Sequence, residues 1–600
     1  MPEFLCIWKG SDLGSSAGDR FPCSVLLKES LWRRFIDDKI ICVKSKARLM
    51  VRLRRKKEKM AKIISMKEAA DMLFDGCVVC GVSFGVEGWP AEFGEAVEKR
   101  FLETGHPANI TNIHAAGFIS GGCWGHEGLI GLDISSHEST TPAVAKLIEE
   151  NKLPAWYMPL GSMLQMYTEI GRGMPGVLTK IGLGTFMDAR VNGGALNQKA
   201  EEYDKKVTEE GGRHFVEYVP DFFGEEYLFY SIPKIDFGIM RGTTADTNGN
   251  ITAEYECLNL ELGAVARATK ACGGKVIVEV ERIAAPGSLN PKLVKIGQNL
   301  VDYIVVDEHP ELVTHGLNYK LYKGIRYWDG LNGQIKVPTD AIPVMPFDPK
   351  KVIIRRALME IDRGTMCNFG IGLPTFCGGV LAEEGEMDNV VMISESGSVG
   401  GVPGGGPDFG CHWNNEWSCD QKDHFDWFDG TGLDFGVFGL SEAQEDGSIN
   451  VSKLNGVTLG VGGFTDITTG AKKACFIGTF TAKGLKEHIE DGKLVIDQEG
   501  KLQKFVKKSE QIAYDAPLAV KNGKPGLYIT ERCVFKAVEG GLELIEVAPG
   551  IDIEKDIIAN MGFRPIIPEG GPALMPPEIF QETWGLLSKH LDEKEAAAAK

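Results

Sequence analysis

Short apolar runs alternate with segments of helical periodicity from residue 60 onward, and this alternation limits the possible folds more than any other feature of the sequence. CVVCGVSFG (77–85) is typical of a buried strand, and PAEFGEAVEKRFLET (90–104) of a helix. LGAVARATKACGG (262–274) predicts another helix, which leads into the strand KVIVEVERI (275–283). Strands that alternate with helices predict an α/β protein with mostly parallel sheets.

A proline-rich stretch divides this pattern into two halves. GQIKVPTDAIPVMPFDPK (333–350) has four prolines and little periodicity, after which the alternation resumes. FGIMRGTTADTNGNIT (237–252) also resembles FGVFGLSEAQEDGSIN (435–450), 198 residues further on, which indicates a duplicated unit. We therefore predict two similar open α/β lobes, residues 60–335 and 347–585, joined by a linker at 336–346. The cleft between them is the expected ligand site.

The two ends of the chain do not follow this pattern. Residues 1–59 include the basic run KSKARLMVRLRRKKEK (44–59), and we expect them to be a poorly ordered leader unrelated to the lobes. The protein is then expected in the cytoplasm; if the leader is instead a targeting segment, it is expected in a mitochondrial-type organelle. Residues 586–600 are predicted to form a tail with a helical spacer.

The overall charge and hydropathy exclude two classes of partner. The formal net charge is −18, whereas binding to nucleic acid needs a clustered basic face. No apolar run approaches the roughly 18–20 residues of a membrane span. We expect neither nucleic acid nor a membrane as a partner.

The fourteen cysteines do not have the spacing of a disulfide scaffold, and we expect buried free thiols. Cys77 and Cys80 enclose two valines in a predicted strand, which favours burial over a redox or zinc role. A second, more widely spaced group of cysteines and histidines consists of Cys411, His412, Cys419 and His424. Its spacing matches no familiar zinc template, and we predict no metal site.

The stretch SESGSVGGVPGGGPDFG (394–410) is the strongest candidate for a functional site. It places Glu395 at the end of the predicted strand NVVMIS, and glycines follow it. Two more glycine-rich strand ends are expected nearby, at 370–372 and in LGVGGF (459–464). Ligands of open α/β sheets bind beyond the carboxyl ends of strands. Glycine there lets a ligand approach the backbone, whose N–H groups can bind a developing oxyanion.

The glycine-rich stretch fits no common phosphate or hydrolase motif. GxxxxGK[ST] and GxGxxG are absent from it, and Ser396 does not lie in GxSxG. Glu395 itself is then the candidate nucleophile, since a carboxylate is ionised at neutral pH and a thioester has a good leaving group. A structural Glu395 that caps a turn or forms an ion pair is the alternative.

The chain resembles family I CoA-transferases, and within that family the propionate and acetate (short-chain acyl) CoA-transferases. The resemblance rests on several stretches besides the one at Glu395: GLGTFMDARVNGGALN (182–197), NFGIGLP (368–374), FDWFDGTGLDF (425–435), GTFTAKGLK (478–486), YITERCVF (528–535) and VAPGIDIEKDI (547–557). It implies that Glu395 forms a covalent glutamyl-CoA thioester. It also implies oxyanion or CoA contacts at Gly462, Gly463, Gly370, Gly372, Asn368, Gly400 and Gly401.

The substrate side of the cleft departs from the family pattern. Relatives commonly carry a glutamine where this chain has Leu160, which can donate no hydrogen bond. Ser162 is a candidate substitute donor; otherwise the acyl preference differs. SFGVEGWP (83–90) also departs, and GGCWGHEGL (121–129) matches only in part, with His126 expected to be a packed histidine.

The resemblance implies a ping-pong transfer of CoA from a short-chain acyl-CoA to a small carboxylate. Coenzyme A is then a substrate carrier, and no other cofactor is required. A homo-oligomer is expected from the family. An acyl-CoA hydrolase on the same scaffold and a non-catalytic ligand-binding protein are the alternatives.

Overall fold

The computed structural model describes residues 61–85, 87–117, 123–309, 328–338, 344–430 and 432–598. The chain divides into two compact units, 1–59 and 60–600, and only the second contains described residues. The predicted leader therefore lies outside the described residues, as do residues 339–343 of the predicted linker. The lobe boundaries stay predictions. Below, the N-terminal lobe means described residues up to 309, and the C-terminal lobe those from 344.

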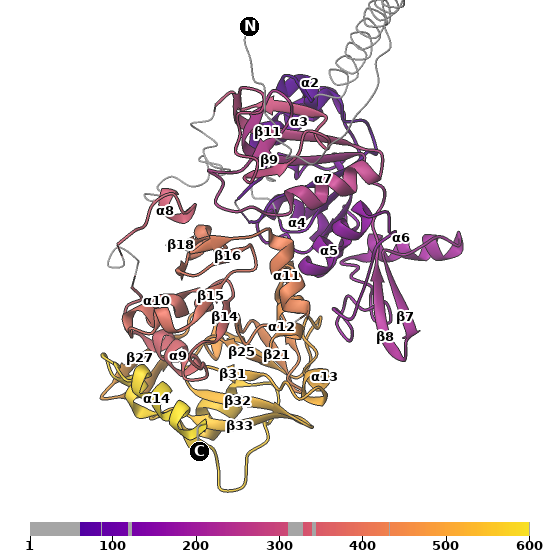
Figure 1. Ribbon diagram of the computed structural model, residues 1–600. Coiled ribbons are helices and arrows are strands. Elements are labelled where there is room, and N and C mark those ends of the chain that lie inside the picture. Colours follow the sequence, from indigo (N-terminus) through magenta and orange to yellow (C-terminus); the bar gives the residue numbers. More distant parts are fainter. Residues whose placement is uncertain are drawn as a thin grey trace, which may run out of the picture. The chain divides into compact units, whose positions relative to one another are not determined.

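A mostly parallel sheet forms the centre of the N-terminal lobe, as the alternating pattern predicted (Figure 1). Neighbouring strands run parallel along the whole order β1-β13-β11-β9-β2-β3-β4-β5, and β10 (Ile251–Thr252) is antiparallel to β9 and to β12 (Val294–Ile296). In this order the strands are β1 (Lys62–Ile63), β13 (Tyr303–Val306), β11 (Lys275–Ala284), β9 (Phe237–Asp246), β2 (Val78–Gly81), β3 (Ile110–His114), β4 (Ile130–Ser135) and β5 (Ala155–Tyr157).

Helices follow the strands of this sheet. The helices are α2 (Met66–Asp71), α3 (Ala91–Thr104), α4 (Pro142–Glu149), α5 (Leu160–Gly171), α6 (Gln198–Glu209) and α7 (Leu262–Ala271). A small antiparallel sheet joins β6 (Val177–Thr179), β8 (Glu225–Tyr230) and β7 (Val216–Phe222). β5 ends at Tyr157, two residues before the extended Pro159, which caps α5, and Leu160 is already helical. α8 (Trp328–Leu331) lies beyond the lobe and contacts β18.

The C-terminal lobe has a parallel centre, β15-β14-β20-β25-β31, flanked by antiparallel strands. The whole order is β19 (Trp417–Ser418), β16 (Ser398–Val399), β15 (Val391–Ile393), β14 (Met366–Phe369), β20 (Phe435–Gly439), β25 (Lys473–Ile477), β31 (Leu527–Ile529), β32 (Cys533–Val538), β33 (Gly541–Val547) and β34 (Ala573–Leu574). Its α-helices are α9 (Pro349–Leu358), α10 (Cys377–Glu383), α11 (Gln421–Gly430), α12 (Phe464–Gly470), α13 (Ala516–Lys521) and α14 (Leu587–Ala598).

Short ladders and turns complete the C-terminal lobe. The ladders are β17 (Val402–Pro403) with β18 (His412–Trp413), β21 (Glu442–Gln444) with β22 (Ile449–Asn450) and β30 (Phe505–Val506), β23 (Lys453–Leu454) with β24 (Val457–Thr458), β26 (Thr481–Ala482) with β29 (Leu502–Gln503), and β27 (Lys486–Glu490) with β28 (Lys493–Gln498). The short helical turns are η4 (Leu373–Phe376), η5 (Met387–Asn389), η6 (Gly406–Asp408), η7 (Ile553–Ile557), η8 (Ile558–Asn560) and η9 (Pro577–Phe580). In the tail, Leu587 and Leu591 of α14 are buried in the core of this lobe.

The sequence repeat has the same local structure in both lobes. In the first copy, Ile251 of β10 pairs antiparallel with Ala245 of β9. In the second copy, Ile449 of β22 pairs antiparallel with Ala443 of β21. The strands β9 and β20, which begin the two copies, each lie inside the parallel part of their sheet. The repeat therefore marks corresponding positions in two similar α/β lobes.

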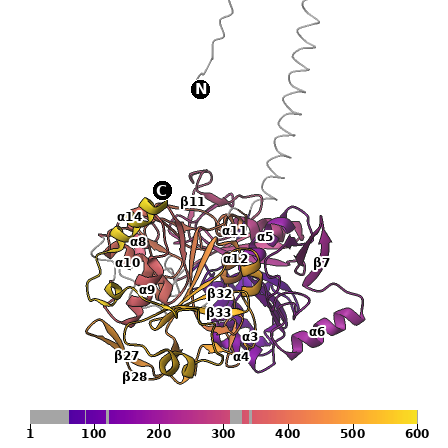
Figure 2. The ribbon, with the colours of Figure 1, turned by 90° about the horizontal axis from the view of Figure 1, so that it is seen from below.

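The two lobes meet where α5 contacts α11 and α12 (Figures 1 and 2). Leu160 of α5, Phe425 of α11 and Ile467 of α12 belong to the same buried apolar cluster. The apolar core therefore continues from one lobe into the other at this contact.

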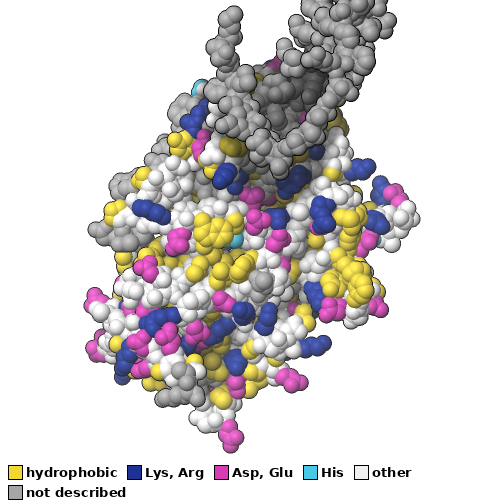
Figure 3. All heavy atoms as spheres, viewed as in Figure 1, with side chains coloured by type: hydrophobic (Ala, Val, Ile, Leu, Met, Phe, Trp, Pro, Cys, Tyr) yellow, Lys and Arg dark blue, Asp and Glu magenta, His cyan; other side chains and the backbone are white. Residues whose placement is uncertain are grey.

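Charged groups of both signs are interspersed on the face shown in Figure 3, where Lys and Arg do not gather into a stripe. Among the described helices, none combines the length and the apolar character needed to cross a membrane.

Candidate active site

Glu395 lies two residues after the end of β15, and the residues on both sides of it are held in place. The Asn368 side-chain amide donates to the Ile393 carbonyl oxygen at 3.1 Å, which ties β14 to the end of β15. The Ser394 hydroxyl donates to the Gly410 carbonyl oxygen at 2.8 Å, and the Ser396 hydroxyl donates to the same oxygen. Hydrogen bonds on both sides of Glu395 thus fix its backbone.

The Glu395 side chain points at a glycine across a close contact. A methyl group at Gly463 would lie 2.0 Å from Glu395 Oε2 and 2.7 Å from Phe425 Cζ. Only a residue without a side chain fits there, although the backbone of Gly463 is ordinary, with φ −83°. Glycine at 463 therefore makes room for the carboxylate.

The Glu395 carboxylate lacks the partners that a structural glutamate would have. Among the described residues it forms no hydrogen bond and no ion pair, and it is partly shielded from solvent. Burial alone raises the pKa of Glu395 from 4.5 to about 7. A carboxylate that is partly buried and has no partner is costly to keep ionised, and such groups cluster at functional sites.

The glycines before α12 form the seam between the lobes. The N–H groups of Val461 and Gly462 both donate to the Ser136 carbonyl oxygen, at 2.9 and 3.1 Å. In return, the Leu160 N–H donates to the Gly462 carbonyl oxygen at 3.1 Å. Gly460 has φ +109°, and a methyl group on it would lie 2.2 Å from His137 Cα. The predicted strand end LGVGGF therefore runs along the N-terminal lobe and then starts a helix.

The predicted site residues Gly462 and Gly463 differ in whether the backbone N–H is already hydrogen-bonded. The Gly462 N–H is occupied by Ser136. The Gly463 N–H lies at the start of α12 beside Glu395 and has no hydrogen bond within the described part of the chain. Gly463 is thus the better placed of the two to bind an oxyanion.

The substrate-side candidates lie at the start of α5, across the seam. Leu160 is fully buried in the apolar cluster that the lobes share. The backbone N–H and the hydroxyl of Ser162 both point to Asp466 Oδ1, at 3.1 and 3.5 Å. Burial and the charge of Asp429 hold the pKa of Asp466 well above its ordinary value. Ser162 therefore anchors α5 to α12, and its hydroxyl is occupied.

The remaining predicted glycines lie in loops around β14 and β16. Gly370 ends β14 with an N–H bond to the Val437 carbonyl oxygen at 2.9 Å, and Gly372, with φ +86°, precedes η4. Gly400 and Gly401 both have positive φ, and a methyl group on Gly401 would lie 2.0 Å from the Trp413 carbonyl oxygen. The structure gives the last two a clear packing reason, and their CoA contact stays a prediction.

Other histidines and cysteines have structural partners. His126 Nε2 is 2.7 Å from Glu98 Oε1. Cys77 is buried, which raises the pKa of its thiol to about 12. In the more widely spaced group, His412 bonds to the Gly400 carbonyl oxygen and His424 to that of Ser394. Two described groups have the compactness of a metal site, and neither includes His412, Cys419 or His424.

Sequence reasoning assigned no role to five residues that complete the site. These are Ser136 and His137 at the seam, Phe425 beside Glu395, Asp466 below α5, and Gly410 under the Glu395 backbone. Phe425 and Gly410 lie inside stretches that were singled out, but contacts so distant in sequence leave no local pattern.

A carboxylate without a partner, beside an open glycine backbone where two α/β lobes meet, is an arrangement suited to chemistry on activated acyl groups. Comparison with known proteins agrees. The family model for coenzyme A transferase matches residues 63–307. Caffeate CoA-transferase of Acetobacterium woodii is 40% identical over 540 residues, covering 88% of this chain and 98% of the relative. The chain belongs to the CoA-transferase family, and the protein is a CoA-transferase.

Further relatives support the same assignment. Acetate CoA-transferase YdiF of Escherichia coli K12 is 34% identical over 511 residues, covering 84% of this chain and 92% of the relative. The crystal structure of the acyl-CoA transferase YdiF apoenzyme from E. coli O157:H7 superposes with a TM-score of 0.79 at 31% identity, over 88% and 97% of the two chains. A thioester complex of that enzyme with CoA gives 0.78. These matches confirm the predicted fold of two α/β lobes.

Proposed function

We propose that the protein transfers CoA from a short-chain acyl-CoA to a carboxylate acceptor through a thioester on Glu395. The observation that carries this proposal is the partly buried Glu395 carboxylate, which has no hydrogen-bond or ionic partner among the described residues and faces the bare backbone of Gly463. A carboxylate that is partly shielded from water and has no cationic partner is a stronger nucleophile than a fully exposed or paired one, because less solvation must be removed when it attacks.

The first half-reaction proceeds through an anhydride. A Glu395 carboxylate oxygen attacks the thioester carbonyl carbon, the carbon–sulfur bond breaks, and an acyl–glutamyl anhydride and the CoA thiolate form. The thiolate then attacks the glutamyl carbonyl carbon, the anhydride carbon–oxygen bond on that side breaks, and the donor leaves as a carboxylate. Glu395 now holds CoA as a thioester.

The second half-reaction reverses these steps with another carboxylate. The acceptor attacks the glutamyl thioester, the thiolate leaves, and it then attacks the acyl carbonyl of the new anhydride. The Glu395 carboxylate is restored, with no net change in protons or electrons. These steps use no cofactor besides CoA itself. In each tetrahedral intermediate, the Gly463 N–H is our candidate donor to the oxyanion, because it lies at the start of α12 and has no hydrogen bond within the described part of the chain.

The identity of the carboxylic acid that accepts CoA is a separate part of the proposal. Short-chain acids are the first candidates, in keeping with the acetate CoA-transferase relative. A larger aromatic acid is the second candidate, because the relative from Acetobacterium woodii is named for caffeate. Both are carboxylates and fit the same chemistry at Glu395.

Trapping of the intermediate tests the proposal. The full-length protein is incubated with propionyl-CoA, treated with borohydride and digested, and its peptides are weighed. We expect reduction of a thioester, seen as a mass change confined to the peptide that holds Glu395. Glu395→Gln should show no such change and should lose transfer by at least about 10³-fold. Glu539→Gln, which alters an exposed carboxylate in a distant turn, is the matched control and should behave like the wild type.

Parallel assays separate the rival functions. CoA exchange that depends on added acetate, propionate or caffeate identifies the transferase and ranks its acceptors. Release of free CoA without any acceptor identifies a hydrolase. Wild-type protein that is neither modified nor active, or a Glu395→Gln variant that still transfers CoA, would overturn the proposal.

A further inference from the structure

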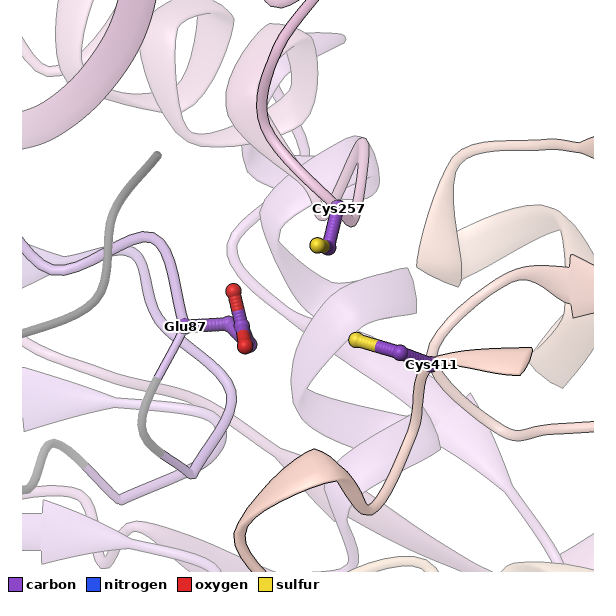
Figure 4. A group of neighbouring side chains, drawn as sticks. All are labelled: Glu87, Cys257 and Cys411. Atoms are coloured by element: carbon purple, nitrogen blue, oxygen red, sulfur yellow. The ribbon is translucent and has the colours of Figure 1, made fainter. Parts of the chain in front are cut away.

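Three buried side chains from distant parts of the chain point toward one another beside the lobe contact. Glu87 follows β2, Cys257 follows β10, and Cys411 precedes β18 (Figure 4). They are 2%, 4% and 0% exposed. One carboxylate oxygen and the two sulfur atoms all lie within 4.8 Å of one another. The transfer chemistry at Glu395 uses none of them.

The carboxylate of this trio lacks a neutralising partner. Glu87 Oε2 is buried and has no hydrogen-bond partner within the described residues. The other charged groups near Glu87 are the carboxyls of Glu256 and Asp408, which repel its negative charge. The Cys411 thiol donates a hydrogen bond to Glu87 but carries no positive charge, so an ionised carboxylate in these surroundings is strongly destabilising unless a proton or a cation neutralises it.

We propose that Glu87, Cys257 and Cys411 bind a thiophilic divalent cation, with Zn²⁺ as the best match, across the boundary between the two lobes. Two sulfur ligands and one carboxylate oxygen are a donor set that zinc accepts, with a water in the fourth position. Tetrahedral zinc with Zn–S bonds of roughly 2.3 Å needs sulfur atoms about 3.8 Å apart, which lies within the observed spread of the trio.

No zinc-ligand spacing predicted this group, because its members are 154 or more residues apart in the sequence. Glu87 does lie in SFGVEGWP, the stretch that departs from the family pattern. A reciprocal backbone pair between Phe84 and Glu87 closes a tight turn, which directs the carboxylate inward.

The site would join the lobes next to the nucleophile. Cys411 directly follows Gly410, whose carbonyl oxygen accepts both serine hydroxyls that flank Glu395. On the other side, the Phe84 ring packs against the same glycine. A bound cation would therefore tie the N-terminal lobe to the segment that supports Glu395, while staying outside the reaction itself.

Cobalt and zinc binding test the proposal without any assay of transfer. The reduced full-length protein is stripped with a chelator, freed from it, and titrated with Co²⁺ and then with Zn²⁺. We expect one tightly bound ion per chain. Co²⁺ should give a near-ultraviolet thiolate-to-metal charge-transfer band, and Zn²⁺ should abolish it. X-ray absorption at the zinc edge of the wild-type protein should show two sulfur ligands, with no need for variants.

Variants locate the site. Cys257→Ser and Cys411→Ser should each lose about half of the charge-transfer intensity and bind the ion at least about tenfold more weakly. Glu87→Gln keeps both thiols, so it should keep the band per bound ion while it weakens binding. Cys475→Ser, which removes a buried thiol of β25 outside the trio, is the matched control and should change nothing.

Several results would overturn the site. They are no saturable binding by the wild-type protein, a zinc ion without sulfur ligands, binding that is unchanged in both cysteine variants, or a disulfide between Cys257 and Cys411 in the isolated protein. The site and the proposed transfer reaction fail separately, because neither metal readout depends on turnover.

Discussion

At the scale of a residue, the decisive feature of Glu395 is that its backbone is held firmly while its carboxylate has no bonded partner among the described residues. Hydrogen bonds at Ile393, Ser394 and Ser396 hold its backbone, while the carboxylate itself forms none among the described residues. A capping or ion-paired glutamate would show the opposite pattern. The hydrogen bonds of the site therefore hold the Glu395 backbone in place and leave the carboxylate without a bonded partner.

The raised pKa of Glu395 predicts the pH dependence of transfer. The pKa is about 7, so the carboxyl is protonated below this value and becomes a nucleophile above it. The kcat/KM for the acyl-CoA donor should therefore rise with pH through about 7, rather than through the ordinary 4.5. Initial rates with propionyl-CoA from pH about 5 to about 9 measure this profile. A profile that is flat above pH about 5.5 would show that the carboxylate is better solvated than the structure indicates.

At the scale of secondary-structure elements, the site depends on how the end of β15 meets the start of α12. Glu395 projects from the first and Gly463 begins the second, with Phe425 of α11 beside both. α5 closes this arrangement from the other lobe, since Ser162 bonds to Asp466 of α12. The helices α5, α11 and α12 and the end of β15 therefore all contribute side chains or backbone to this contact.

Gly463→Ala tests this contact. The added methyl group meets Glu395 Oε2 at 2.0 Å, whereas φ −83° suits alanine, so the effect is steric and local. We expect transfer to fall about 10²-fold through displacement of the carboxylate, with little change in the unfolding temperature. Gly430→Ala in α11, where a methyl group meets nothing within 4 Å, is the matched control. Equal rates in the two variants would contradict the role given to Gly463.

Much of these elements could be predicted from the sequence, because the signals are local. The alternation of strands and helices predicted both sheets, and the 198-residue repeat predicted matching positions that the pairs Ala245–Ile251 and Ala443–Ile449 confirm. A charged residue between a buried strand and a glycine run was enough to single out Glu395. Contacts that join distant segments, such as Ser136 with Gly462 or the trio at Glu87, depend on how the lobes dock. The hydrophobic periodicity of the sequence carries no information about that docking.

At the scale of the whole molecule, the lobes meet through backbone as well as side chains. Residues 136–138 and 459–462 exchange main-chain hydrogen bonds, which demand a fixed register. His137 and Gly460 form a bridge within this strip, where the glycine leaves no gap. Backbone bonds of this kind fix the distance between the lobes more firmly than flexible ion pairs do.

Gly460→Ala should separate the lobes. Its methyl group would lie 2.2 Å from His137 Cα, in addition to the strain of alanine at φ +109°. We expect a lower unfolding temperature and a loss of transfer of at least about 10²-fold. Gly456→Ala also places alanine at positive φ, +78°, but in open space, so it controls for strain alone. Thermal unfolding and transfer assays on both variants decide. If they behave alike, the seam does not set the geometry of the site.

The seam also has a consequence for the order in which the protein is made. Ser136, which receives the N–H groups beside α12, leaves the ribosome long before Glu395 and Gly463. Domains fold as units during synthesis, beginning from the N-terminus. The docking surface is therefore already built when Glu395 and Gly463 emerge, so a newly made C-terminal lobe can dock as soon as α12 has formed.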